Sequence, residues 1–94
     1  MPMIDLIFPV LGTTVPTDHA YSLYAALTKL VPVFHRPDTT VAIASIRGDN
    51  QGDRVRRLDP RRSKLRLRLP TEEIPTVLLL AGKALQVDGH RIRL

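Results

Sequence analysis

In the stretch SKLRLRL, residues 63–69, basic and leucine side chains alternate strictly from Lys64 onward. Successive side chains of a β-strand point to opposite faces, so the pattern predicts a strand over these residues. Its leucines would face a core, and Lys64, Arg66 and Arg68 would face solvent or a polyanion. A strand with one buried face requires a sheet around it and a layer of helices or strands to cover it.

The residues before this strand predict three further elements. Residues 3–10 (MIDLIFPV) are rich in strand-forming side chains and predict a first strand. Apolar residues then recur at three- and four-residue spacing over 20–34, which predicts a helix whose free amides Thr17 or Asp18 would cap. Residues 41–46 (VAIASI) predict a buried second strand, followed by a polar, glycine-containing loop.

The residues after it predict a second helix and two short strands. Glu72 and Glu73 precede an apolar run that predicts a helix over 74–81. Residues 85–87 and 90–94 predict two strands joined by an Asp-Gly turn. The order βαββαβ predicts an α+β fold of the ferredoxin-like type, with four antiparallel strands and two helices packed on one face of the sheet.

Length and composition narrow the function classes. The chain has 94 residues and no cysteine, which excludes disulfides, thiol nucleophiles and the paired-cysteine metal chaperones that share this fold. We find no acidic pair at metal-ligand spacing, no apolar run long enough for a membrane span and no signal peptide. We therefore expect a single-domain, soluble, cytoplasmic chain without a metal or other cofactor.

The positive charge is concentrated in one segment, residues 54–68. This segment carries eight basic residues and one acid, whereas the rest of the chain carries six basic and eight acidic residues. A local positive field of this kind is typical of a surface that binds phosphate backbones. The alternative is a solvated basic loop with no partner. The third strand carries no aromatic residue, so we expect no base stacking of the RNA-recognition-motif type on its outer face. The expected RNA-binding residues are Arg54, Arg56, Arg57, Arg61, Arg62, Lys64, Arg66 and Arg68.

Several stretches together resemble one known family. They are IDLIFPVLG (4–12), DHAYSLY (18–24), LVPVFH (30–35), LRLRLP (65–70) and DGHRIRL (88–94). In this order they resemble the CRISPR-associated repeat-RNA endoribonucleases of the RAMP superfamily, most closely the myxan-type branch. The resemblance implies antiviral defence through processing of pre-crRNA. It also implies metal-independent cleavage within each repeat, by attack of a 2′-hydroxyl that leaves a 2′,3′-cyclic phosphate.

The resemblance covers only the amino-terminal half of that family. Residues 1–94 correspond to one ferredoxin-like domain, and the family's second ferredoxin-like half has no counterpart in them. A second copy or another CRISPR-associated chain could complete the fold, with CRISPR repeat RNA as the main partner. The alternative function is a non-catalytic RNA-binding or assembly module of a CRISPR effector complex. A small-ligand regulatory domain is disfavoured, because it has no need of so basic a segment.

Histidine is the side chain best suited to the proton transfers of such a cleavage, because it titrates near neutrality. His35 follows the first helix, at a position that resembles the catalytic histidine of many family members, and it is our first candidate. His19, at the start of that helix, is the second. Each also has a non-catalytic interpretation. His19 could be a residue that fixes the strand-to-helix loop, and His35 could be a surface residue at a helix end. His90, beside the Asp-Gly turn, is expected to be structural.

Overall fold

A three-stranded antiparallel sheet built around the alternating stretch forms the centre of the fold. The computed structural model describes residues 2–36, 38 and 40–94. Strand β6 (Lys64–Pro70) pairs with β1 (Met3–Pro9) on one side and with β3 (Ala42–Ile43) on the other. The side chains of Leu65, Leu67 and Leu69 are fully buried, whereas those of Arg66 and Arg68 are exposed. The predicted strand and its register are confirmed.

The first helix and its cap differ from the prediction in one respect. Helix α1 (Ala20–Leu30) is followed by the 3₁₀ turn η1 (Pro32–His35), as the apolar stripe and Pro32 lead one to expect. The N-cap, however, is His19, and it makes no side-chain cap hydrogen bond. The prediction that Thr17 or Asp18 caps the helix was wrong, because the chain enters the helix one residue later and His19 is buried there instead.

The second helical segment is less regular than predicted. Instead of one helix over 74–81, a 3₁₀ turn η2 (Thr71–Glu73), a short α2 (Ile74–Val77) and a 3₁₀ turn η3 (Leu78–Leu80) follow one another. Pro75 and the β-branched Thr76 and Val77 have low helix propensity, and a run this short contains few propagating hydrogen bonds. The tighter 3₁₀ geometry at both ends is common in such cases.

The structure contains a small second sheet that the sequence analysis did not predict. It has the order β2-β5-β4 and consists of Thr14–Pro16, Val55–Arg57 and Asp49–Asn50. Strands of two or three residues are too short to show an alternating pattern. The predicted strand over 41–46 is correspondingly shorter, since only Ala42–Ile43 is assigned as β3, although the Ala44 N–H still bonds to the Arg66 carbonyl at 3.0 Å.

The carboxy-terminal strands form a hairpin of their own. Strands β7 (Ala84–Val87) and β8 (His90–Arg93) are joined by Asp88 and Gly89, which both adopt positive φ angles. Among the described residues, one isolated bridge connects β8 to the chain that continues from β1. It joins Arg93 to Leu11, two residues after the end of β1. The next residue that faces this edge of β1 is Pro9, which has no N–H to donate. The expected four-stranded sheet is therefore a three-stranded sheet plus a hairpin.

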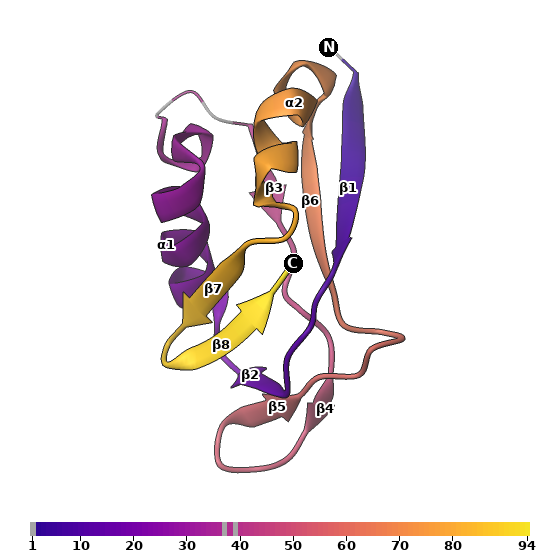
Figure 1. Ribbon diagram of the computed structural model, residues 1–94, viewed down its shortest axis with the longest axis vertical. Coiled ribbons are helices and arrows are strands. Elements are labelled where there is room, and N and C mark those ends of the chain that lie inside the picture. The colour runs from indigo at the N-terminus through magenta and orange to yellow at the C-terminus, as the bar shows by residue number, and fades with distance from the viewer. Residues whose placement is uncertain (1, 37, 39) are drawn as a thin grey trace.

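The helices cover one face of the three-stranded sheet, and the small sheet lies at one end of an elongated molecule (Figure 1). Side chains from α1, α2 and the strands meet in one core, which includes Leu23, Leu27, Leu67, Val77 and Ile92. This arrangement of antiparallel sheets and two helices is an α+β fold consistent with the predicted ferredoxin-like type. No helix in the described part of the chain is long and apolar enough to cross a membrane.

Candidate functional site

His19 lies inside the protein, where both of its ring nitrogens have partners. Its side chain is 2% exposed. Nδ1 lies 2.7 Å from the Pro16 carbonyl oxygen, and Nε2 accepts the backbone N–H of Ile46 at 2.9 Å. A nitrogen that faces a carbonyl must carry the proton, and one that faces an N–H must lack it, so these bonds fix a single neutral tautomer. In this arrangement neither nitrogen is free to exchange a proton with a substrate. The geometry favours the scaffold interpretation of His19.

His35 has the opposite environment. It is exposed at the end of η1. The turn that carries it is held on both sides: the Tyr24 hydroxyl donates to the Phe34 carbonyl at 3.1 Å, and Arg36 forms an ion pair with Glu73 at 2.6 Å. These contacts join the turn to α1 and to η2. The structure therefore presents an accessible imidazole on a braced backbone, which suits a group that must meet a substrate in a fixed geometry.

The two candidate histidines do not share one site. His19 precedes the first residue of α1, and His35 ends the turn that follows its last residue. An α-helix of 11 residues is about 16 Å long at about 1.5 Å per residue. The candidates consequently lie toward opposite ends of the helix, whose course is visible in Figure 1.

His90 lies at the start of β8, where its Nδ1 is 2.8 Å from the Thr14 hydroxyl of the small sheet. This bond joins the hairpin to β2 and fits the structural role expected for His90. Two tyrosines of α1 are also accessible, since Tyr24 is 36% exposed and Tyr21 is 81% exposed. Within the described residues, no cluster of three or more histidine or acidic side chains is arranged to hold a metal ion.

The basic segment divides into paired and unpaired cations. Arg68 bonds to Asp5 at 2.9 Å, and Arg62 contacts both Asp49 and, at 3.1 Å, Asp59. Their hydrogen bonds with these acids raise the pKa of Arg68 and the pKa of Arg62. The hydrogen bond from Arg68 lowers the pKa of Asp5 below its ordinary value.

Asp59 is held in the same way. The backbone N–H of Arg61 and, second, the side chain of Arg62 lower the pKa of its carboxyl. Arg56 is occupied differently, since its guanidinium donates to the Ile46 carbonyl at 2.7 Å and to the Asn50 side chain. These arginines have structural partners as well as positive charge.

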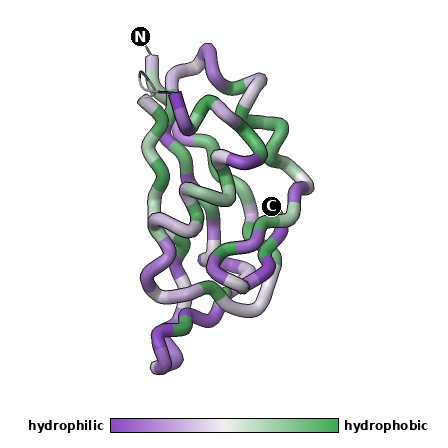
Figure 2. Tube along the Cα trace, turned by 90° about the vertical axis from the view of Figure 1, so that its left-hand side faces the viewer, coloured by the Kyte–Doolittle hydropathy of each residue, from purple (hydrophilic) through white to green (hydrophobic). Residues whose placement is uncertain are grey.

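Five cations of the segment have no side-chain hydrogen bond or ion pair to any residue that the structure describes. They are Arg54, Arg57, Arg61, Lys64 and Arg66. Arg54 and Arg57 belong to the β4–β5 hairpin, a hydrophilic projection at the lower end of Figure 2. Lys64 and Arg66 lie instead on the face of β6 turned away from the core. The segment therefore forms two basic areas along the molecule.

The sequence analysis did not predict one candidate RNA-binding residue, Arg47. Arg47 lies outside residues 54–68, yet it lines a hollow of about 130 Å³ together with Arg62, Lys64 and Arg66. The contact that brings it there joins the Ser63 hydroxyl to the Arg47 carbonyl at 2.7 Å. Antiparallel pairing of the predicted strands 41–46 and 63–69 would have brought the end of the first beside the start of the second. We name Arg47, Lys64 and Arg66 the open basic cluster, because all three cations lack an acidic partner among the described residues.

Comparison with known proteins gives the family. The family model described as "Cas6 Crispr" matches residues 4–94. The chain belongs to the Cas6 family. It is 37% identical, over all 94 residues, to the CRISPR-associated endonuclease Cas6 of Myxococcus xanthus strain DK1622. This confirms the resemblance to the CRISPR repeat-RNA endoribonucleases.

The chain spans 40% of the length of that Myxococcus relative. The alignment agrees with the expected resemblance to the amino-terminal part of the family. Both the open basic cluster and the exposed His35 lie within the part of the chain that matches the Cas6 model.

Proposed function

We propose that this Cas6 chain is the repeat-RNA-contacting domain of an endoribonuclease that processes pre-crRNA in the cytoplasm as part of antiviral defence. The observation that carries the proposal is the match to a named Cas6 endonuclease across the whole chain. The cleavage would occur within each repeat and need no metal ion.

The open basic cluster would bind the phosphate backbone of the RNA. Arg47 and Arg66 are exposed, and Lys64 is half-buried. Guanidinium groups without an acidic partner are available for bidentate bonds to phosphate oxygens. Contacts of this kind position the RNA without reading its sequence. Arg54, Arg57 and Arg61 would extend the same field toward the small sheet, while Arg56, Arg62 and Arg68 add to it through charge.

His35 would perform a proton transfer in the cleavage. The 2′-oxygen attacks the adjacent phosphorus, the bond from phosphorus to the 5′-oxygen breaks, and a 2′,3′-cyclic phosphate remains. A base must take the proton of the 2′-hydroxyl, and an acid must protonate the departing 5′-oxygen. An exposed imidazole on a braced turn can do either. His19 supports the site indirectly, through the fold.

The second candidate function is a non-catalytic RNA-binding or assembly module. Two observations favour it: His19 is sequestered, so only one of the expected histidines is accessible, and the chain spans 40% of the relative. In that case another CRISPR-associated chain, or a second copy, would supply the catalytic groups.

Incubation of the chain with end-labelled repeat RNA in EDTA separates the two functions. The enzyme proposal predicts a cut within the repeat and a product that ends in a 2′,3′-cyclic phosphate. RNA that is bound but left intact, even after addition of the carboxy-terminal part of the Myxococcus protein, would support the module.

A further inference from the structure

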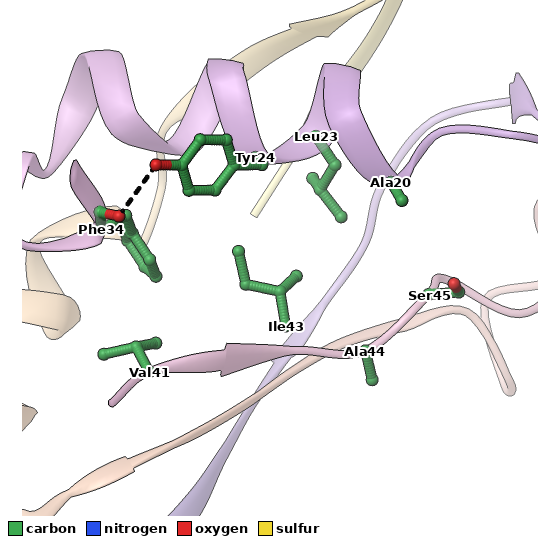
Figure 3. A pocket seen from close by; sticks show the side chains of 8 residues that line it. All are labelled: Ala20, Leu23, Tyr24, Phe34, Val41, Ile43, Ala44 and Ser45. Carbon is green, nitrogen blue, oxygen red and sulfur yellow. Dashed lines mark hydrogen bonds between the residues drawn. The ribbon is translucent and has the colours of Figure 1, made fainter. Parts of the chain in front are cut away.

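A cavity of about 270 Å³ lies between α1 and the edge strand β3, and neither candidate function yet uses it. Figure 3 shows the side chains of Val41 and Ile43 rising from β3 toward the helix, with the ring of Tyr24 opposite them. The buried side chains of Phe34 and Leu23 also line the cavity, and Ser45 lies at the end opposite to Phe34. The cavity is open to solvent, and Tyr24 is its most exposed aromatic wall.

We propose that this cavity receives one unpaired nucleobase of the bound RNA, an inference that rests on the proposed RNA-processing function. Pockets for drug-sized ligands begin at about 300 Å³, so this volume suits a single ring system. Its walls are mainly apolar, and Tyr24 supplies an aromatic face. Stacking on such a face binds bases of any sequence.

Polar groups for the edge of a base lie beside these walls. Ala42 pairs with Arg68, and the Ala44 N–H bonds to the Arg66 carbonyl, so these residues direct their backbone groups toward β6. The intervening Ile43 directs its N–H and carbonyl to the free edge of the strand. The Ser45 hydroxyl adds a donor and an acceptor at the cavity wall. A base in the cavity therefore has hydrogen-bonding partners on Ile43 of β3 and on Ser45, two residues further along the chain.

The positive charge needed for the attached phosphate lies on the other side of β3. A second hollow, lined by Arg66 and by the Arg68–Asp5 ion pair, shares Ile43 and Ala44 with the cavity, so a single strand separates the two. A nucleotide that crosses this edge could place its phosphate near Arg66 and its base against Tyr24. A peptide strand suits the site less well, because β3 itself pairs over only two residues and offers a short edge for strand addition.

The cavity also adjoins the proposed acid–base group. Phe34, which lines it, directly precedes His35, and its carbonyl accepts the Tyr24 hydroxyl. Tyr24 would thus hold a base with its ring and brace the His35 turn with its hydroxyl. A base captured here would lie close to the site of cleavage, which makes Tyr24 a candidate RNA-positioning residue.

The test compares an eight-nucleotide oligoadenylate with an abasic ribose-phosphate oligomer of the same length. Loss of one stacked base costs about 1–3 kcal/mol, so we expect the oligoadenylate to bind about 5- to 160-fold more tightly. Tyr24→Ala or Tyr24→Leu should remove most of this difference, and Tyr24→Phe should retain it. Tyr21→Ala is the matched control, because Tyr21 projects from α1 outside this cavity, and it should bind both oligomers like the wild type.

A second measurement does not depend on variants that fold. The methyl NMR signals of Ile43 and Val41 should shift when the oligoadenylate is added and stay in place with the abasic oligomer. Equal, salt-dependent binding of both oligomers without methyl shifts would overturn the base cavity and leave the RNA surface intact. Absence of binding by either oligomer would count against the proposed RNA function itself. Methyl shifts caused only by a strand-forming peptide would assign the cavity to a protein partner.

Discussion

The imidazole Nε2 of His19 accepts the backbone N–H of Ile46 at 2.9 Å, across 27 residues of sequence. Nδ1 of the same ring bonds to the Pro16 carbonyl, so one buried side chain ties β2 and the start of α1 to the segment that follows β3. Ile46 is itself fully buried. The ring thus replaces water for two backbone groups that would otherwise be buried without partners.

Replacement of His19 by alanine should destabilise the fold. It leaves the Ile46 N–H and the Pro16 carbonyl without their partners and opens a cavity, for which we expect a loss of about 2–4 kcal/mol. Urea denaturation followed by circular dichroism measures this loss. The control is His35→Ala, an exposed change that should stay within about 0.5 kcal/mol of the wild type. Equal losses for the two variants would contradict the scaffold role of His19.

Gly48→Ala should also be costly, for a different reason. A Cβ atom at Gly48 would lie 2.3 Å from the Arg57 carbonyl oxygen and 2.8 Å from Cγ of Arg56, so the small sheet must shift to admit it. We expect about 1–3 kcal/mol of lost stability, as for other overpacked sites. Gly52→Ala is the comparison, since nothing lies within 4 Å of its added Cβ and only its positive φ opposes the change. A smaller loss at Gly48 than at Gly52 would show that this close approach is relaxed in solution.

Two double variants of equal net charge test whether the arginines without acidic partners bind the RNA phosphates. Arg47→Ala/Arg66→Ala and Arg62→Ala/Arg68→Ala each remove two positive charges, but only the first pair lacks acidic partners among the described residues. If Arg47 and Arg66 contact phosphates directly, their loss should make the slope of log K against log salt less steep by about 1.4 for single-stranded RNA. The second double variant should change the slope less, because Arg62 and Arg68 act through their charge and not through direct phosphate contacts. The reverse order would contradict the open basic cluster.

Sequence reasoning recovered the elements with long patterns and missed those without them. The seven-residue alternation in β6 fixed its buried face, and the stripe in α1 fixed the first helix, because periodicity needs several turns or pleats to be recognised. Strands β2, β4 and β5 are too short for such a signal. The separation of β8 from the sheet also lacks a periodic signal, although Pro9 of β1 has no N–H with which to pair.

The site divided in the same manner. The charge count located the basic segment, but it could not show which arginines are paired, since Asp5 and Asp49 lie far from Arg68 and Arg62 in sequence. It also missed Arg47, which the pairing of two strands brings to Lys64 and Arg66. The sequence allowed either a catalytic or a structural role for His19. The structural role is favoured because its two ring nitrogens bond to the backbone of Pro16 and Ile46. The role of His35 stays a prediction.

His35→Ala should lower the rate of repeat cleavage while leaving RNA binding nearly unchanged. A positioned acid or base contributes about 10²- to 10⁴-fold, and the exposed side chain contributes little to stability. Single-turnover cleavage and a filter-binding titration measure the two quantities separately. His90→Ala is the histidine control. Its cleavage rate should fall only in proportion to any loss of folded protein. Wild-type cleavage by the His35 variant would remove this imidazole from the mechanism.

The most direct test of the proposed function is single-turnover cleavage, in EDTA, of a repeat RNA that carries one 2′-deoxy nucleotide immediately before the cut. Attack by the 2′-oxygen requires that hydroxyl and no metal ion. We predict that the all-ribose repeat is cut to a 2′,3′-cyclic phosphate and that the deoxy repeat is bound with equal affinity and stays intact. Cleavage of the deoxy repeat, or an all-ribose repeat that is bound and never cut with or without the carboxy-terminal part of the Myxococcus protein, would contradict it.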